Sequence, residues 1–493
     1  MVVSLVATLF TSIIVANVIG KEHLGPYIYV GWLTNITAGV GGSGLSVTTR
    51  KYMAEYLNRG EGSIAHAIYS YALRLQTLIA IALIAVGLPL ALLEGKPGYR
   101  VVSALLVMSM APRMIACIPS QANMAGERLQ RNTGPALLGG AIGVSLTLFS
   151  LWMGWGLRGI AFSFALGCTV EAVGKFYSVR RWLGPLPTGT ISPELKKRMS
   201  SYSGQGLVLM VLNIVVWDRS DILILHWMNS DVGQVALFGI SFGFTDKLLM
   251  LPNAFAGSLG ATMMAQFGRD EERVREIMIS GARYGFLVAL PLLVGMACIS
   301  KPFITLAYKA EFQTMIPVLT LAALLAIPKA LTLAPTLLLQ TVEKQGFLIW
   351  IGCICGAVDI GLDFLLTPGY GAVGATLANG TAQTLAAVLL WVWVYRYCEK
   401  DLRLGEFGRI ALAGALMAGL VLLVQHLVPI SGYLGLALSI VTGALGWLGA
   451  LRLTGAISPT DGKRLRLIGR RLPVRIQSIL DRCLSLLSTE PVP

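Results

Sequence analysis

Stretches of about 20 apolar residues follow one another along almost the whole chain, and they limit the possible folds more than any other feature. A helix of about that length spans the hydrocarbon of a bilayer. Hydrophobic residues make up 55% of the chain and charged residues 13%, which excludes an ordinary soluble globular protein. We predict an all-α integral membrane protein with about 14 transmembrane helices, near residues 2–20, 27–48, 64–93, 99–121, 134–155, 159–178, 201–227, 233–265, 277–299, 313–340, 346–366, 371–395, 408–428 and 433–453.

Lysine and arginine are distributed unevenly between the predicted loops. With the N-terminus inside, the inside loops and tail hold 27 of these residues and the outside loops hold six. Because positively charged loops stay in the cytoplasm, we predict a multi-pass membrane protein with both termini cytoplasmic. The basic tail is expected to lie on anionic lipid and not to bind nucleic acid. The six outside cations are Lys21, Lys96, Arg100, Arg158, Lys301 and Lys309.

The cysteines and histidines indicate neither a disulfide framework nor a metal site. The seven cysteines lie in apolar runs or in segments expected on the cytoplasmic side, and the four histidines form no cluster. Residues 2–20 are expected to be a retained span, because neither a basic leader nor a small-residue cleavage site is evident. No soluble catalytic domain fits between the spans, so we expect no enzyme activity.

A proline-broken segment occurs twice in the chain. Residues 112–128, PRMIACIPSQANMAGER, are echoed 216 residues later by residues 328–344, PKALTLAPTLLLQTVEK. Each copy has a proline followed at once by a cation, a second proline seven residues after the first, and a Glu-cation pair at its end. Such a repeat indicates two halves, which are parallel because each holds six spans. We predict an N-lobe at 1–180, a basic cytoplasmic linker at 181–200, a C-lobe at 201–396, two further spans at 397–454 and a basic tail at 455–493.

The cations of the repeated segment, Arg113 and Lys329, are candidate substrate-binding residues. A charge near the bilayer centre costs a few kcal/mol unless it faces water or a partner. Matching cations in two halves would converge on a central axis and favour an anion, most naturally a phosphate or pyrophosphate. Arg74, Arg219 and Lys247 would enlarge that positive field. The alternative is that the prolines only kink the helices and the cations extend to the inner surface.

Acidic residues form a second set of candidates. Asp359 and Asp363 are one helical turn apart, and Asp218 and Asp221 are three residues apart, so each pair shares one helix face. Carboxylates among other oxygen atoms inside a membrane bind Na⁺, or they carry a proton if repulsion or burial raises the pKa of one of them. The alternative is pairing with Arg219 or exposure at the outer surface.

The chain resembles the multidrug/oligosaccharidyl-lipid/polysaccharide (MOP) exporter superfamily, and within it the Wzx-type O-antigen and exopolysaccharide flippases. The resemblance lies in the twin six-span halves and in Gly-x-x-Gly at 156–159 and 371–374. It also lies in GKEHLGPYIYVGWLTN near the start and in Trp217 to Asp221 followed by DVGQVALFGISFGFTDKLLMLP. It implies a protein that moves undecaprenyl-diphosphate-linked sugars from the cytoplasmic to the periplasmic leaflet by alternating access between two lobes.

The fourteen-span count is also similar to the lipid II flippase family, MurJ, in which the two extra spans form a groove for the lipid tail. That resemblance implies a sodium site formed by Asp218 or Asp221, by Asp359 and Asp363, and by Thr376. Asp359 stands where the family pattern has Asn, which leaves Na⁺ and H⁺ coupling both open. No other cofactor is implied.

We therefore predict a flippase for lipid-linked oligosaccharide that serves polysaccharide export, with membrane lipid and a polysaccharide polymerase as further partners. A MurJ-type lipid II flippase is an alternative, because both cargoes share undecaprenyl diphosphate. A multidrug/cation antiporter of the same superfamily is a second alternative, but it would favour a lumen poor in cations. A membrane polymerase or ligase would be expected to carry a large periplasmic loop, and the predicted outer loops are short.

Overall fold

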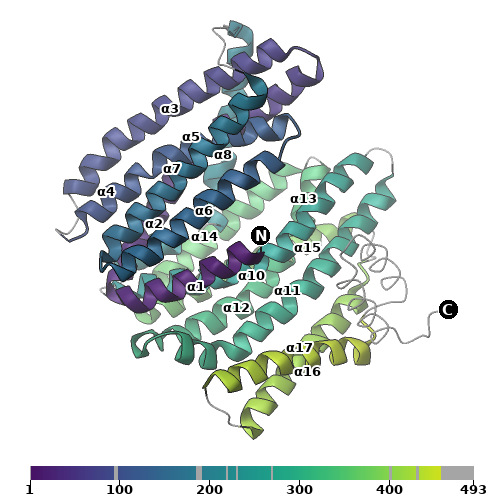
Figure 1. The fold of residues 1–493 in the computed structure, drawn as a ribbon. Helices are drawn as coiled ribbons and strands as arrows, with labels where there is room; N and C mark the ends of the chain where they lie inside the picture. Colours follow the sequence, from purple (N-terminus) through teal and green to yellow (C-terminus); the bar gives the residue numbers. More distant parts are fainter. Residues whose placement is uncertain are drawn as a thin grey trace. The chain divides into compact units, whose positions relative to one another are not determined.

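The protein is helical throughout the part of the chain that the structure describes. This computed structural model describes residues 2–93, 98–184, 191–217, 220–228, 231–267, 270–342, 344–398, 402–428 and 432–456. Within these ranges the chain forms seventeen α-helices and one short 3₁₀ helix, and no strand (Figure 1). The helices belong to two compact units, Met1–Ala236 and Leu237–Pro493. The predicted all-α class is confirmed.

The first unit is a bundle in which α2 contacts most of the other helices. Its helices are α1 (Val2–Ile19), α2 (Lys21–Asn58), α3 (Gly62–Leu93), α4 (Arg100–Met108), α5 (Met110–Ala125), α6 (Gln130–Trp152), α7 (Gly156–Leu183), α8 (Pro193–Trp217) and α9 (Asp221–Met228).

The second unit contains a bundle of long helices and a C-terminal helical hairpin. It holds α10 (Gly233–Gln266), which begins four residues before the boundary, then α11 (Glu271–Ala307), η1 (Ala310–Phe312), α12 (Met315–Ala330), α13 (Leu333–Thr341), α14 (Gln345–Tyr370) and α15 (Ala372–Tyr397), followed by the hairpin α16 (Leu404–Leu427) and α17 (Gly432–Thr454).

Each of the fourteen predicted spans corresponds to one helix or two consecutive helices. Eleven are long and apolar enough to cross a membrane, with α4–α5 and α12–α13 each counted as one span. The helices α1 and α2 stand at the predicted first and second spans, and α8 with α9 stands at the predicted seventh. The chain is thus a multi-pass membrane protein, and its helices extend several residues beyond many predicted span ends.

The low hydropathy of α2 follows from its central position in the first unit. Its buried face carries small or hydroxyl-bearing residues, including Gly42, Gly44 and Thr48. Small residues let helix backbones approach closely in a membrane, where hydrophobicity alone does not hold helices together. A Cβ atom at Gly44 would lie 2.7 Å from the backbone oxygen of Ser203 on α8, and Gln76 Nε2 of α3 donates to the Gly41 carbonyl oxygen at 3.1 Å.

The predicted 20-residue linker is shorter in the structure. Helix α7 continues to Leu183 and α8 begins at Pro193, because the Ser192 hydroxyl accepts a hydrogen bond from the Leu195 N–H at 3.2 Å and caps the new helix. Since α8 packs on α2, it belongs to the first compact unit, as does α9. The unit boundary therefore follows residue 236, whereas the predicted C-lobe starts at residue 201.

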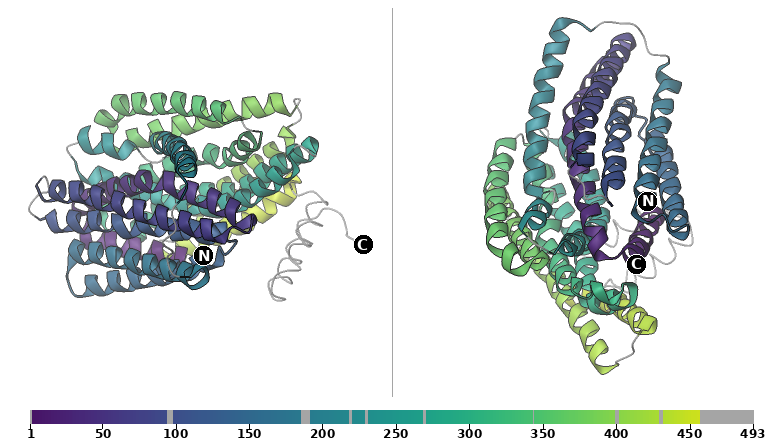
Figure 2. Two further views of the ribbon diagram at one scale, coloured as in Figure 1. Left: turned by 90° about the horizontal axis from the view of Figure 1, so that it is seen from above. Right: turned by 90° about the vertical axis from the view of Figure 1, so that its left-hand side faces the viewer.

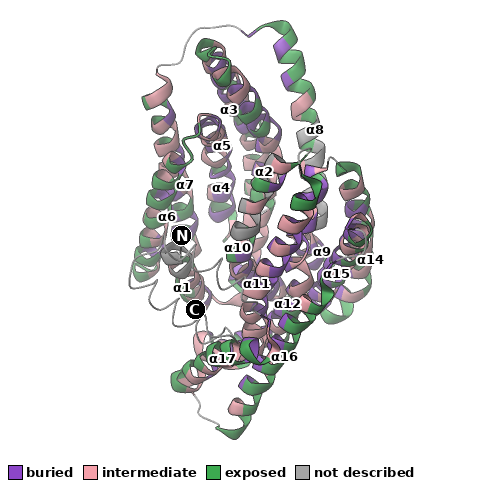
Figure 3. Ribbon diagram, turned by 90° about the vertical axis from the view of Figure 1, so that its right-hand side faces the viewer, coloured by how far each residue is buried: buried purple, intermediate pink, exposed green. Residues whose placement is uncertain are grey.

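Exposed residues, coloured green in Figure 3, occur along most of the helices, and many of them are large and apolar. On α3, Leu78, Ile81 and Val86 are 63%, 58% and 63% exposed. Their spacing puts them on one face of the helix. In a soluble protein such a surface would be an aggregation hazard, but it suits contact with lipid tails.

The hairpin of α16 and α17, near the yellow end of the colour scale in Figure 2, packs against α11, and a buried arginine of α11 binds both of its ends. Arg283 Nε lies 2.8 Å from Glu406 Oε2 of α16, and Arg283 donates through Nη2 to the Ala456 carbonyl oxygen at 2.7 Å. Phe286 and Leu290 of α11 pack against Ile410 in the same region. One side chain therefore holds both ends of the hairpin at the same point of the bundle.

Helices α6 and α7 pack closely at glycine residues, which gives a test of the packing. A Cβ at Gly139 would lie 2.6 Å from the Gly167 carbonyl oxygen, whereas a Cβ at the next residue, Gly140, would meet nothing within 4 Å. We expect Gly139→Ala to lower the thermal unfolding midpoint of the detergent-solubilised protein, at a cost of about 1–3 kcal/mol from overpacking. Gly140→Ala is the matched control and should leave the midpoint unchanged or slightly raised. Equal midpoints for the two variants would contradict this close packing.

Candidate functional site

The two copies of the proline-broken segment fold differently. Pro112 lies in the first turn of α5, and Pro335 lies in the first turn of α13, where a missing N–H is tolerated. The break between α4 and α5 thus precedes Arg113 in the first copy, whereas the break between α12 and α13 follows Lys329 in the second. As a result, Arg113 is in the first turn of α5 and Lys329 is in the last turn of α12.

The groups that contact Arg113 in the described part of the chain are neutral. Its Nη2 donates to Asn35 Oδ1 of α2, and its guanidinium carbon lies 5.7 Å from the centre of the Phe164 ring of α7. The side chain is half-buried. An amide oxygen and an aromatic face orient a guanidinium group without cancelling its charge. Arg113 therefore remains able to attract an anion.

Lys329 is paired with a carboxylate of its own unit. Its Nζ lies 3.4 Å from Asp246 Oδ1 of α10, and the two side chains are 24% and 37% exposed. The pair is nearly neutral as a whole, which differs from the predicted matched pair of open cations. The neighbouring Lys247 lies with its Nζ 5.8 Å from the centre of the Phe244 ring.

A small polar cavity adjoins the Lys329–Asp246 pair. It has a volume of about 10 Å³ and is lined by residues of α10, α12 and α15, including Thr245, Asn379 and Gln383. That volume holds one water molecule at most. Gln383 Nε2 donates to Asn379 Oδ1 at 2.6 Å, so the two amides form one buried polar group beside the ion pair.

The acidic pair of α14 is fully buried. Asp359 is 1% exposed and Asp363 is not exposed, and the Thr367 hydroxyl lies one turn further along and donates to Asp363 Oδ1 at 3.2 Å. A Cβ at Gly374 of α15 would lie 2.5 Å from the Leu366 carbonyl oxygen, so the two antiparallel helices meet closely at this level.

Counting from that contact places the acidic pair opposite polar residues of α15. One turn along each helix brings Asp363 to the level of Thr376 and Asn379, and a second turn brings Asp359 to the level of Gln383. Thr376 is buried and donates to the Ala372 carbonyl oxygen at 2.7 Å. Two carboxylates with hydroxyl and amide oxygens are a set that suits a small cation or a mobile proton.

The remaining predicted site residues are dispersed. Asp221 is fully buried in the first turn of α9, in the first unit, and Arg74 is exposed on α3. Asp218 and Arg219 lie outside the described residues. Among the described residues, no group of three or more His, Cys, Asp or Glu side chains is placed to hold a metal ion.

Four polar residues at these sites were not predicted from the sequence. Asn35 and Asp246 contact the two cations, and Asn379 and Gln383 lie beside the ion pair. The signal for the last two was their i, i+4 spacing on a span that is otherwise rich in alanine and glycine. The sequence pointed to Asp246 less strongly. It is an acid in a predicted span, and the adjacent Lys247 points in a different direction on the helix, so a partner on another helix was needed.

The sequence matches two families of known proteins. The family described as "Polysaccharide biosynthesis protein" matches residues 63–317, more than half of the chain, and "Lipid II flippase MurJ" matches residues 241–443. No curated protein sequence matches the chain.

Solved structures share the fold at low sequence identity. A lipid II flippase MurJ in an inward closed conformation is 14% identical, with a TM-score of 0.73 over 91% of this chain and 96% of that chain. An inward-facing multidrug resistance MATE family transporter of the MOP superfamily is 13% identical, with a TM-score of 0.68 over 81% and 95%. A MOP superfamily transporter from Pyrococcus furiosus with a binding pocket of reverse polarity is 13% identical, with a TM-score of 0.52 over 81% and 94%.

The acidic pair gives a test that needs no cargo. If Na⁺ binds at Asp359 and Asp363, NaCl should raise the thermal unfolding midpoint above the midpoint in KCl or choline chloride at equal concentration. At a Na⁺ concentration a hundred times the dissociation constant, the free energy of unfolding should rise by about 2.7 kcal/mol. Asp359→Asn and Asp363→Asn should each remove the sodium effect, and Glu311→Gln, an exposed acid of the same unit, should retain it. Equal midpoints in the three salts would contradict a sodium site.

Proposed function

The chain belongs to the polysaccharide biosynthesis protein family, within the MOP superfamily, and from this premise we propose that it flips lipid-linked oligosaccharide across a membrane. The cargo is an undecaprenyl-diphosphate-linked oligosaccharide that passes from the cytoplasmic to the periplasmic leaflet for O-antigen or exopolysaccharide export. Movement is by alternating access, and the protein is a transporter of the bacterial inner membrane that makes and breaks no covalent bond.

The observation that carries this proposal is the uncancelled charge of Arg113. A half-buried guanidinium group on a membrane-spanning helix, oriented by Asn35 and Phe164 but not neutralised by them, is suited to bind phosphate oxygens in pairs. A diphosphate is the part of a prenyl-linked sugar that such a group recognises. A pocket for organic cations would be destabilised by the same charge.

Lys329 takes part in a second way. In the structure its ammonium group is held by Asp246 at 3.4 Å, so an arriving diphosphate competes with that carboxylate. Exchange of one anion for the other costs less than exposing an unpaired lysine inside the membrane. The Lys329–Asp246 pair is therefore a resting arrangement from which cargo withdraws the cation.

Ion binding at Asp359 and Asp363 supplies the driving force. Asn379 and Gln383 line the cavity beside Asp246 and lie at the level of the acidic pair along α15, so a cation or proton bound at the acids would change the electric field at the ion pair. An inward flow of Na⁺ or H⁺ thus biases the alternation between the two access states. Both termini remain cytoplasmic, and a polysaccharide polymerase receives the cargo on the periplasmic side.

A lipid II flippase of MurJ type is the second candidate, because that family matches residues 241–443, which include the acidic pair. Lipid II and the polysaccharide precursor share the undecaprenyl diphosphate, so the same cations serve either cargo. The sugar is the part that distinguishes them.

Reconstitution with a fluorescent undecaprenyl-diphosphate oligosaccharide tests the site. Wild type should move the lipid across liposome membranes. Arg113→Ala combined with Lys329→Ala should slow movement by at least about tenfold, because charge-assisted hydrogen bonds contribute about 1.5–3 kcal/mol each.

Two control variants separate an effect on cargo binding from an effect on protein stability. Lys329→Gln with Asp246→Asn removes the ion pair without leaving an unbalanced carboxylate, and it should slow movement although the helices remain neutral. Lys309→Ala, a cation outside the membrane-spanning helices, should move lipid at the wild-type rate. Normal flipping by a folded Arg113→Ala, Lys329→Ala protein would show that these cations only anchor helices.

A further inference from the structure

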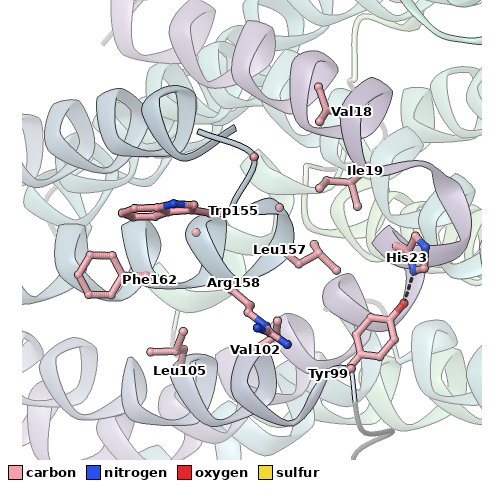
Figure 4. Close-up of a pocket in the computed structure, with 14 residues that line it drawn as sticks. Val18, Ile19, His23, Tyr99, Val102, Leu105, Trp155, Leu157, Arg158 and Phe162 are labelled. Carbon is pink, nitrogen blue, oxygen red and sulfur yellow. Dashed lines mark hydrogen bonds between the residues drawn. The ribbon is translucent and has the colours of Figure 1, made fainter. Parts of the chain in front are cut away.

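A cavity of about 830 Å³ lies at one end of the first unit, where α1 ends and α2, α4 and α7 begin (Figure 4). Its lining has two different parts. Leu105, Trp155 and Phe162 form an apolar part, and Trp155 is 53% exposed. On the other side, the Arg158 guanidinium group lies beside Val102, facing the part of the cavity where His23 and Tyr99 meet.

Two helices that begin at this cavity, α4 and α7, carry an arginine in the first turn, where a positive charge is unfavourable. The start of a helix bears a partial positive charge, so acidic residues are favoured there and cations are not. The first turns of α4 and α7 contain no acidic residue, but they contain Arg100 and Arg158. Neither the α4 cap, Tyr99, nor the α7 cap, Trp155, makes a side-chain hydrogen bond to its helix. An anion at this position would satisfy both helix starts.

The predicted topology makes these cations more unusual. This end of the unit is the outer side, where the positive-inside rule depletes lysine and arginine. Of the six outer cations, Lys21, Arg100 and Arg158 stand in the first turns of α2, α4 and α7. Glu22 also stands in the first turn of α2, and Arg158 is the arginine that lines the cavity.

The aromatic hydroxyl group at the cavity does not oppose an anion. His23 Nδ1 and the Tyr99 hydroxyl are 2.5 Å apart. Burial raises the pKa of Tyr99, and the nearby Glu22 carboxylate raises it further, so the phenol keeps its proton at neutral pH. Glu22 itself does not line the cavity.

We propose that this cavity binds an anionic phospholipid of the outer leaflet, with its phosphate at Arg158 and the starts of α4 and α7 and one acyl chain over Leu105, Trp155 and Phe162. The charge matches a phosphate, and the apolar part exceeds what a free phosphate ion needs. Tryptophan and tyrosine at this depth are typical of the interface between headgroups and hydrocarbon. The bound lipid closes the ends of four helices of the first unit and is separate from the transported cargo.

Photocrosslinking of purified protein tests this site without transport. Phosphatidylglycerol with a diazirine acyl chain should label the segment 155–162, and phosphatidylcholine with the same chain should not. Arg158→Gln should reduce labelling by about tenfold, the loss expected for one charge-assisted contact. Lys309→Gln is the matched control, an outer cation outside this cavity, and should label as wild type.

Competition on the wild-type protein keeps the test valid if Arg158→Gln fails to fold. Unlabelled phosphatidylglycerol should displace the probe, whereas inorganic phosphate at equal concentration should not. Equal labelling by phosphatidylcholine would overturn the proposal, and displacement by inorganic phosphate would indicate a site for free anions instead. Displacement by undecaprenyl phosphate at lower concentration than phosphatidylglycerol would assign the cavity to the cargo and also overturn the proposal.

Discussion

The cost of placing charge inside a bilayer governs how this protein is built. Each ionised group in a membrane-spanning helix costs a few kcal/mol unless it has a partner or water. Arg283 is buried against Glu406 and a carbonyl oxygen, Lys329 lies beside Asp246, and Arg113 contacts an amide and an aromatic ring within the part of the chain that the structure describes. The three cations differ in whether a carboxylate balances their charge. A cation balanced by a carboxylate stabilises the fold, whereas a cation with neutral contacts is available to bind an anionic cargo.

Small residues provide the scaffold that holds these charges in place. The helices that pack most closely, α6 with α7, α2 with α8 and α14 with α15, do so where a glycine lies against the neighbouring backbone. Close backbones leave little space for water, so polar groups between them must satisfy one another. The amides of Asn379 and Gln383 are an example, because they bond to each other beside the Lys329–Asp246 pair.

Most of the fold could be predicted from the sequence, because apolar runs long enough to span a bilayer have few alternatives to a helix. The repeated proline segment pointed to Arg113 and Lys329 as a pair, but it did not show where the helices break, since the break precedes Arg113 and follows Lys329. The partners of those cations were not predictable. Asn35 is 78 residues from Arg113 and Asp246 is 83 residues from Lys329, and neither distance follows from helical spacing.

Selectivity between two cargoes is the most direct measurement of the central idea, that this protein carries an anionic lipid-linked sugar. Wild-type proteoliposomes would be given a fluorescent undecaprenyl-diphosphate oligosaccharide and, in parallel, a cationic dye such as ethidium, with the same ion gradients imposed. We expect the lipid-linked sugar to cross the membrane and the dye to remain where it is, because the uncancelled charge of Arg113 attracts phosphate and repels organic cations. Transport of the dye without movement of the lipid would contradict the proposed cargo and indicate a cation antiporter.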